Sequence, residues 1–143
     1  MPLETLVALT PTIIWEDHRV KLIDQTRLPL DEEYITTDNY RVVCDAIYRL
    51  AIRGAPAIGV AGAYACVLAA NEIEETKFDI FVKIYLEKAD EIGATRPTAI
   101  NLMWAVKQMK NKAINFSGSV DDLKVDLLKL AHEIREDDIE RCH

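Results

Sequence analysis

Glycine, proline and cysteine are all scarce in this chain, whose 143 residues include five glycines, five prolines and three cysteines. So few glycines and prolines exclude a collagen-like or low-complexity chain. Three cysteines are too few for the disulfide framework of a small secreted protein, and none of them stands in a CxxC pair. We therefore expect a globular protein that works in the reducing cytoplasm.

Positive charge is also in short supply, because 17 Lys and Arg residues face 24 Asp and Glu residues, for a net charge of −7. An acidic chain is poorly suited to bind a nucleic-acid backbone or an anionic membrane. The most apolar segment, residues 55–70, is shorter than the about 20 residues that cross a bilayer. Its alanines and two glycines predict a buried core helix instead. We expect neither nucleic acid nor a membrane as a partner.

The first third of the chain has the pattern of short β-strands. Residues 12–16 and 19–23 flank Asp17-His18, with apolar residues alternating in the second run, which predicts a hairpin. Residues 33–37 predict a third short strand. The expected sheet is therefore small and antiparallel.

Helical spacing of apolar residues replaces this pattern after Asp38. The first predicted helix follows Asp38 and runs to about residue 50. The others run from Pro56 to about Asn71, from the residue after Thr76 to Gly93, from Pro97 to about Lys112, and from Val120 towards the end of the chain. The expected fold is α+β, with about three strands followed by a bundle of about five helices. We expect residues 1–118 to form one domain and residues 119–143 to begin a long connecting helix.

Two pairs of residues predict capped helix starts. Thr76 precedes Asp79, and Ser119 precedes Asp122, each with the spacing at which a hydroxyl and a carboxylate cap the first turn. Both pairs stand directly before runs of helical periodicity. We expect each hydroxyl to accept a hydrogen bond from the first turn of its helix.

Two arginines stand just before proline-initiated helices, in Arg53-Gly54-Ala55-Pro56 and in Arg96-Pro97. The first turn of a helix offers free N–H groups and partial positive charge, so it can hold a phosphate. An arginine upstream adds a planar fork that can bind two phosphate oxygens. Two such helix starts, each preceded by an arginine, could form two walls of one anion-binding pocket. The alternative is that both arginines pair with surface carboxylates.

Catalytic and metal-binding patterns are weak by comparison. His18 is expected in an exposed turn, His132 lies beside the apolar stripe of the last helix, and Cys142-His143 are adjacent at the end of the sequence. No pair of residues has the spacing of metal ligands, and no nucleophile has an obvious base. The sequence predicts an anion-binding site without catalytic residues.

A family resemblance becomes visible at the segment Arg53–Gly59, which reads RGAPAIG. Further agreeing segments are residues 22–26 (LIDQT) with Leu28-Pro29, residues 96–99 (RPTA) with Asn101-Leu102 and Trp104, and residues 131–138. Together they resemble the methylthioribose-1-phosphate isomerase family, which is related to the regulatory subunits of translation initiation factor 2B. The resemblance covers nearly the whole chain in the family's order.

This resemblance implies an N-terminal domain that a long helix joins to a Rossmann-like C-terminal domain, which is missing here. It implies interconversion of S-methyl-5-thio-α-D-ribose 1-phosphate and S-methyl-5-thio-D-ribulose 1-phosphate in methionine salvage, with no metal or redox cofactor. The substrate-binding residues of the family map onto Arg53, Gly54, Ala55 and Arg96.

The family's catalytic cysteine and aspartate belong to the C-terminal domain, and nothing in this chain matches them. We therefore assign no catalytic residue and expect the chain alone to be inactive. Its expected partners are the sugar phosphate and the C-terminal domain or chain of the same enzyme, which would be a homodimer when complete. The alternatives are a regulatory subunit of the initiation factor 2B type, a ribose-1,5-bisphosphate isomerase, and a helical interaction module with surface arginines.

Overall fold

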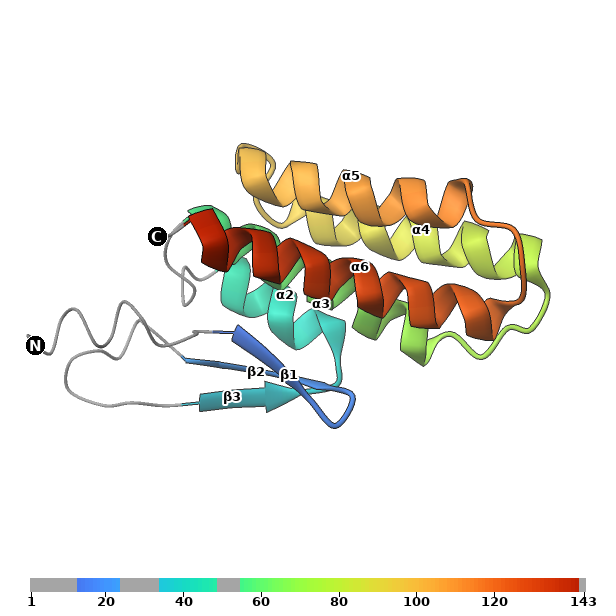
Figure 1. Ribbon diagram of the computed structural model, residues 1–143, viewed down its shortest axis with the longest axis horizontal. Coiled ribbons are helices and arrows are strands. Elements are labelled where there is room, and N and C mark those ends of the chain that lie inside the picture. Colours follow the sequence, from blue (N-terminus) through green and yellow to red (C-terminus); the bar gives the residue numbers. More distant parts are fainter. Residues whose placement is uncertain (1–12, 24–33, 49–54, 142–143) are drawn as a thin grey trace, which may run out of the picture.

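The computed structural model describes residues 13–23, 34–48 and 55–141 of the chain. Its elements, in chain order, are β1 (Ile13–Glu16), β2 (Arg19–Ile23), β3 (Tyr34–Thr37), α2 (Tyr40–Tyr48), α3 (Ala55–Glu72), α4 (Phe78–Ala94), α5 (Ile100–Ile114) and α6 (Val120–Arg141). The expected order of a three-stranded sheet followed by five helices is confirmed for this part of the chain (Figure 1).

The sheet is an antiparallel meander in the order β1-β2-β3. Asp17 and His18 form its first turn with φ angles of 51° and 62°. Positive φ at both positions is what a two-residue hairpin turn requires, and Asp and His tolerate it better than most residues. The register pairs Trp15 with Val20, and Ile13 and Val20 on that face are buried. This apolar face attaches the sheet to the helices.

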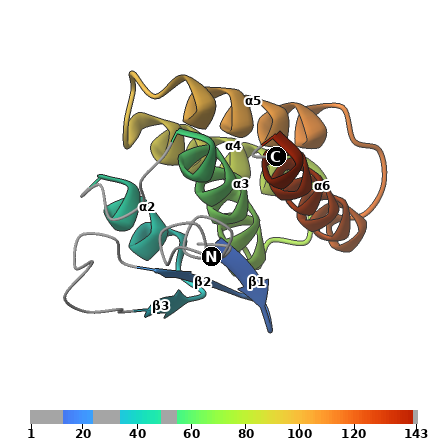
Figure 2. The same ribbon diagram turned by 60° about the vertical axis from the view of Figure 1, so that its left-hand side comes forward.

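Helix α3 is the centre of the molecule and contacts each of the four other described helices (Figure 2). Every residue from Ile58 to Ala70 is buried. A helix that is apolar on all sides can only be stable when protein surrounds it on all sides. Among the described helices, none has the length and hydropathy that crossing a membrane requires.

The direction of the helices alternates along the chain. Figure 1 shows that α3 and α5 begin, and α6 ends, at one end of the bundle, while α4 and α6 begin at the other. Short connections of residues 73–77, 95–99 and 115–119 impose these reversals. As a result, the first turns of α3 and α5 lie at the same end.

The structure confirms one of the two predicted caps. Ser119 Oγ accepts a hydrogen bond of 3.1 Å from the Asp122 N–H. The Thr76–Asp79 prediction is wrong, because α4 is preceded by Lys77 as its N-cap and has no side-chain cap. Glu75 Oε1 instead accepts a hydrogen bond of 2.9 Å from the Lys77 N–H. The connection between α3 and α4 therefore includes Lys77, one residue beyond the predicted cap Thr76.

The predicted proline start of α5 is also wrong. The helix begins at Ile100, and the Ala99 N–H donates to the Arg96 carbonyl at 3.0 Å. Pro97 therefore occupies the second position of a four-residue turn, where its fixed φ is favourable. Similarly, Gly93 does not end α4, which continues to Ala94.

Candidate anion site

The predicted site residues fall into described and undescribed parts of the chain. Ala55 opens α3, and Arg96 opens the turn that leads into α5. Arg53 and Gly54 lie outside the described residues. The structure therefore tests how the two helix starts are arranged, and it leaves the contacts of Arg53 as a prediction.

The second turn of α3 approaches the first turn of α5 closely at Gly59. A Cβ added to Gly59 would lie 3.0 Å from the carbonyl oxygen of Asn101. Gly59 stands about one turn after Ala55, and Asn101 is the second residue of α5. The close approach therefore joins the second turn of α3 to the backbone of the first turn of α5.

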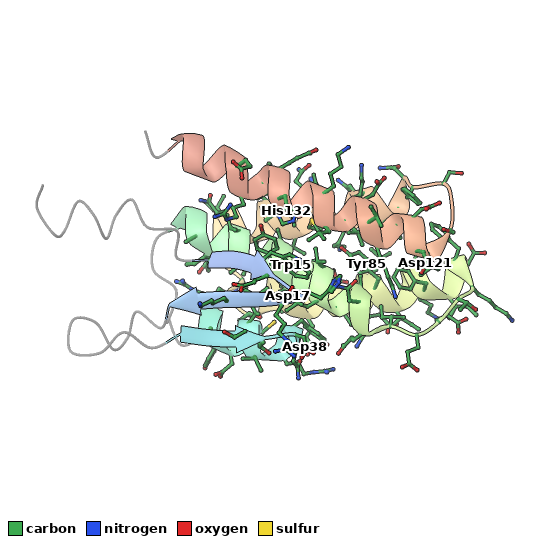
Figure 3. All side chains as sticks on the ribbon, turned by 60° about the horizontal axis from the view of Figure 1, so that its bottom comes forward. Trp15, Asp17, Asp38, Tyr85, Asp121 and His132 are labelled. Atoms are coloured by element: carbon green, nitrogen blue, oxygen red, sulfur yellow. The ribbon has the colours of Figure 1, made fainter. Side chains whose placement is uncertain are left out.

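The charge of these two helix starts suits an anion. Neither α3 nor α5 carries an acidic residue in its first turn. In contrast, α4 has Asp79 there, and α6 has Asp121 and Asp122. Figure 3 shows Asp121 at the end of the bundle far from where α3 and α5 begin. The partial positive charges of α3 and α5 thus have no carboxylate in their own first turns to neutralise them.

Arg96 adds a full positive charge four residues before the start of α5. Its side chain is partly buried, and no carboxylate of the described residues lies within 4.0 Å of its guanidinium. Arg41, by comparison, lies 3.7 Å from Glu91 and 4.0 Å from Glu72. The alternative was that Arg96 pairs with a surface carboxylate. Within the described part of the chain, Arg96 forms no such ion pair.

A shallow apolar groove lies beside the Arg96 turn. It has a volume of about 740 Å³ and is lined by Pro97, Ile100, Met103 and Trp104, together with residues of α4. Ile100, Met103 and Trp104 recur at helical spacing, yet all three are exposed, Ile100 by 79%. The buried face of α5 is formed by Leu102, Ala105, Val106, Met109 and Ala113.

Sequence reasoning missed a polar and aromatic cluster that joins the sheet to α3 and α6 (Figure 3). The Tyr64 hydroxyl and His132 Nδ1 are 2.9 Å apart, and Trp15 stacks on Tyr64 with ring centroids 5.7 Å apart. Arg135 Nε donates to the Ile13 carbonyl at 3.0 Å. The sequence around each of these residues does not predict the cluster, because its contacts join segments that are far apart in sequence. The cluster holds α6 in place against the sheet.

Burial and nearby Arg135 lower the pKa of His132. The unfolded chain therefore binds this proton more tightly than the folded chain. The free energy of unfolding should be highest above the ordinary histidine value of 6.5 and should fall as the pH drops through that value towards the lower folded pKa. Urea unfolding of the wild type and His132→Gln between about pH 7.5 and pH 5.5 measures this loss.

His132→Gln should show a shallower decline in this range, because the titrating group is gone. His18→Asn is the matched control, since it removes the exposed histidine of the hairpin turn and Asn accepts the same positive φ. That variant should follow the wild-type profile. An unchanged slope in His132→Gln would contradict the coupling of His132 to folding.

The described thiols are poor candidates for catalysis. Burial raises the pKa of Cys66 to about 12 and also raises that of Cys44. A thiol that stays protonated is a weak nucleophile. Within the described residues no three His, Cys, Asp or Glu side chains are grouped so that they could hold a metal ion.

Comparison with known proteins gives these features a family context. The sequence model of the initiation factor 2 subunit family matches residues 51–143. The chain belongs to this family. The matched region contains the segment Arg53–Gly59, the Arg96 turn and the whole of α3 to α6.

Within the initiation factor 2 subunit family, the chain is similar to named sugar-phosphate isomerases. It is 44% identical over 128 residues to methylthioribose-1-phosphate isomerase of Synechocystis sp., covering 90% of this chain and 36% of the relative. It is 46% identical over 133 residues to 5-deoxyribose 1-phosphate isomerase of Clostridium botulinum, covering 91% and 38%. A 5-deoxyribose 1-phosphate isomerase is not among the alternatives expected from the sequence.

Two solved structures of the family share the fold. The delta subunit of translation initiation factor eIF-2B from A. fulgidus superposes with a TM-score of 0.84 at 41% identity, covering 90% of this chain and 37% of that one. 5-Methylthioribose 1-phosphate isomerase from Pyrococcus horikoshii gives 0.85 at 27% identity, covering 92% and 38%. The chain thus spans little more than a third of the length of these relatives.

Proposed function

We propose that this chain is the phosphate-binding part of an isomerase that converts S-methyl-5-thio-α-D-ribose 1-phosphate to S-methyl-5-thio-D-ribulose 1-phosphate. The names of the relatives support a sugar 1-phosphate as the substrate. The close approach of Gly59 to Asn101 carries the proposal, because it brings α3, near its beginning, against the first turn of α5, the helix that follows the Arg96 turn. Arg53, Gly54, Ala55 and Arg96 are the proposed phosphate ligands.

The proposed phosphate-binding site would serve an isomerisation that is redox-neutral overall. In an aldose 1-phosphate to ketose 1-phosphate conversion, hydrogen leaves C2 and arrives at C1, so C2 is oxidised while C1 is reduced. No external oxidant or reductant is consumed. The anchored phosphate fixes the position of C1 relative to the groups that assist ring opening and move this hydrogen. Those groups are proposed to lie in a C-terminal domain or chain, which would also complete the proposed homodimer.

A 5-deoxyribose 1-phosphate isomerase is the second candidate, because relatives of that name are 46% identical to the chain. The two substrates share the ribose 1-phosphate and differ only at C5, where one carries a methylthio group and the other a hydrogen. A phosphate site built by α3 and α5 would serve both. Turnover of each by the complete enzyme separates the candidates, whereas a regulatory subunit of the initiation factor 2B type would turn over neither.

The direct test is an amide NMR titration of the 143-residue chain with S-methyl-5-thioribose 1-phosphate, 5-deoxyribose 1-phosphate and inorganic phosphate. We expect all three to shift the same amides, those of Gly54, Ala55 and the residues that follow Pro97. In the proposed site these N–H groups would donate to the anion, and such hydrogen bonding changes their chemical shifts. Inorganic sulfate serves as a second anion of similar shape.

Shifts confined to the α4 and α6 starts, or no shifts with any of the anions, would contradict the proposed site. Shifts with sulfate of the same size as those with the sugar phosphates would indicate a general anion site without sugar recognition. Both outcomes can be read in the same spectra, because resonance assignment would separate the amides at the starts of α3, α4, α5 and α6.

A further inference from the structure

Gly59 lies where the main chain of α3 touches the main chain of α5. A Cβ added there would lie 3.0 Å from the carbonyl oxygen of Asn101 and 3.4 Å from its carbonyl carbon. Both atoms belong to the opening turn of α5, so they cannot rotate away as a side chain can. A larger residue at position 59 would have to push the start of α5 away from α3.

The other two glycines inside helices meet softer surroundings. A Cβ at Gly62 would collide with the Cδ1 atom of buried Leu102, which is the end of a flexible side chain. A Cβ at Gly93 would lie 3.6 Å from Val106 Cγ1, an ordinary van der Waals contact. Substitution at Gly62 would therefore force side chains to repack, and substitution at Gly93 would disturb little.

We infer that Gly59 is a positioning residue, which keeps the first turn of α5 and the Arg96 turn against the first turn of α3 so that both face one phosphate. The inference rests on the proposed function. Hydrogen bonds to an anion work within a window of a few tenths of an ångström. Because a Cβ at position 59 shifts α5 by about that much, the two sets of N–H groups would no longer converge on the same anion.

Three alanine variants of this chain test the inference: Gly59→Ala, Gly62→Ala and Gly93→Ala. Each is titrated with inorganic phosphate to obtain a Kd, and each is unfolded with urea to measure stability. We expect Gly59→Ala to weaken phosphate binding about tenfold or more. Gly62→Ala should lose stability but keep its Kd within about twofold, and Gly93→Ala should bind like the wild type and be no less stable.

The outcomes separate this inference from the proposed function. A wild-type chain that does not bind phosphate overturns the proposed function itself. If the wild type binds and Gly59→Ala binds equally well, the positioning role is overturned while the function stands. Equal weakening in Gly59→Ala and Gly62→Ala also overturns it, because loosening of the core would then suffice.

A folding failure of Gly59→Ala is covered by two further measurements. The substitution is first repeated in the Gly93→Ala background, which gains helix propensity. In the wild type, saturating phosphate should also shift the amides of Gly59 and Asn101, since the opening turns of α3 and α5 hold the anion jointly. If these two amides stay unmoved while those of the Arg96 turn shift, Gly59 does not position the site.

Discussion

Leu102→Ala should lower the free energy of unfolding by about 2–5 kcal/mol, the usual cost of emptying a buried leucine site. The Leu102 side chain is fully buried between α5 and α3, and its tip fills the space that the missing Cβ of Gly62 leaves open. Urea unfolding followed by circular dichroism measures the loss. Met103→Ala is the control, because Met103 is the next residue and is 52% exposed.

The same site predicts a strongly non-additive pair. Leu102→Ala removes the Cδ1 atom that a Cβ at position 62 would meet, so Gly62→Ala should cost less in that background than in the wild type. Coupling between contacting residues is typically about 0.5–3 kcal/mol. Additive losses, or a loss below about 1 kcal/mol for Leu102→Ala alone, would contradict this packing of α5 on α3.

Arg96→Ala should weaken phosphate binding about tenfold or more, which corresponds to about 1.4 kcal/mol or above. The guanidinium is one of the two full positive charges of the proposed site, together with that of Arg53, and no carboxylate of the described residues pairs with it. In a complete polypeptide that isomerises the sugar phosphate, kcat/KM should fall by a similar factor. Titration of the chain and steady-state kinetics of the complete enzyme provide the two measurements.

Two variants make this test specific. Arg96→Lys keeps the charge but loses the planar fork, so it should fall between the wild type and Arg96→Ala. Arg41→Ala removes an arginine that lies close to Glu91 and Glu72, and it should bind phosphate as the wild type does. Wild-type affinity in Arg96→Ala would remove this residue from the site.

Periodicity in the sequence predicted the order of the elements well, because each element buries one face or is buried completely. The alternation around Val20 and the unbroken apolar run of α3 have few other structural solutions. It could not separate the two apolar faces of α5, where Leu102 is buried and Trp104 is 45% exposed. Spacing alone does not say which face meets the core.

Local chemistry predicted the site less evenly. Ser119 caps α6 as expected, but at Thr76 and at Pro97 the signals for a helix start are equally compatible with a turn that precedes the helix. The decision depends on contacts such as that of Glu75 with the Lys77 N–H. The starts of α3 and α5 lie near each other because the two helices pack closely at Gly59. This contact joins segments far apart in sequence, so no single short motif predicts it.

The alternation of helix directions divides the molecule into two ends with different tolerance for change. The connections of residues 73–77 and 115–119 both lie at the end opposite the Arg96 turn. At that end Lys124 Nζ of α6 donates to the Ile73 carbonyl at 3.2 Å. Insertions, affinity tags or fluorescent labels placed after Ser117 would sit a full helix length away from the proposed ligands. Binding could then be followed with a reporter that does not touch the site.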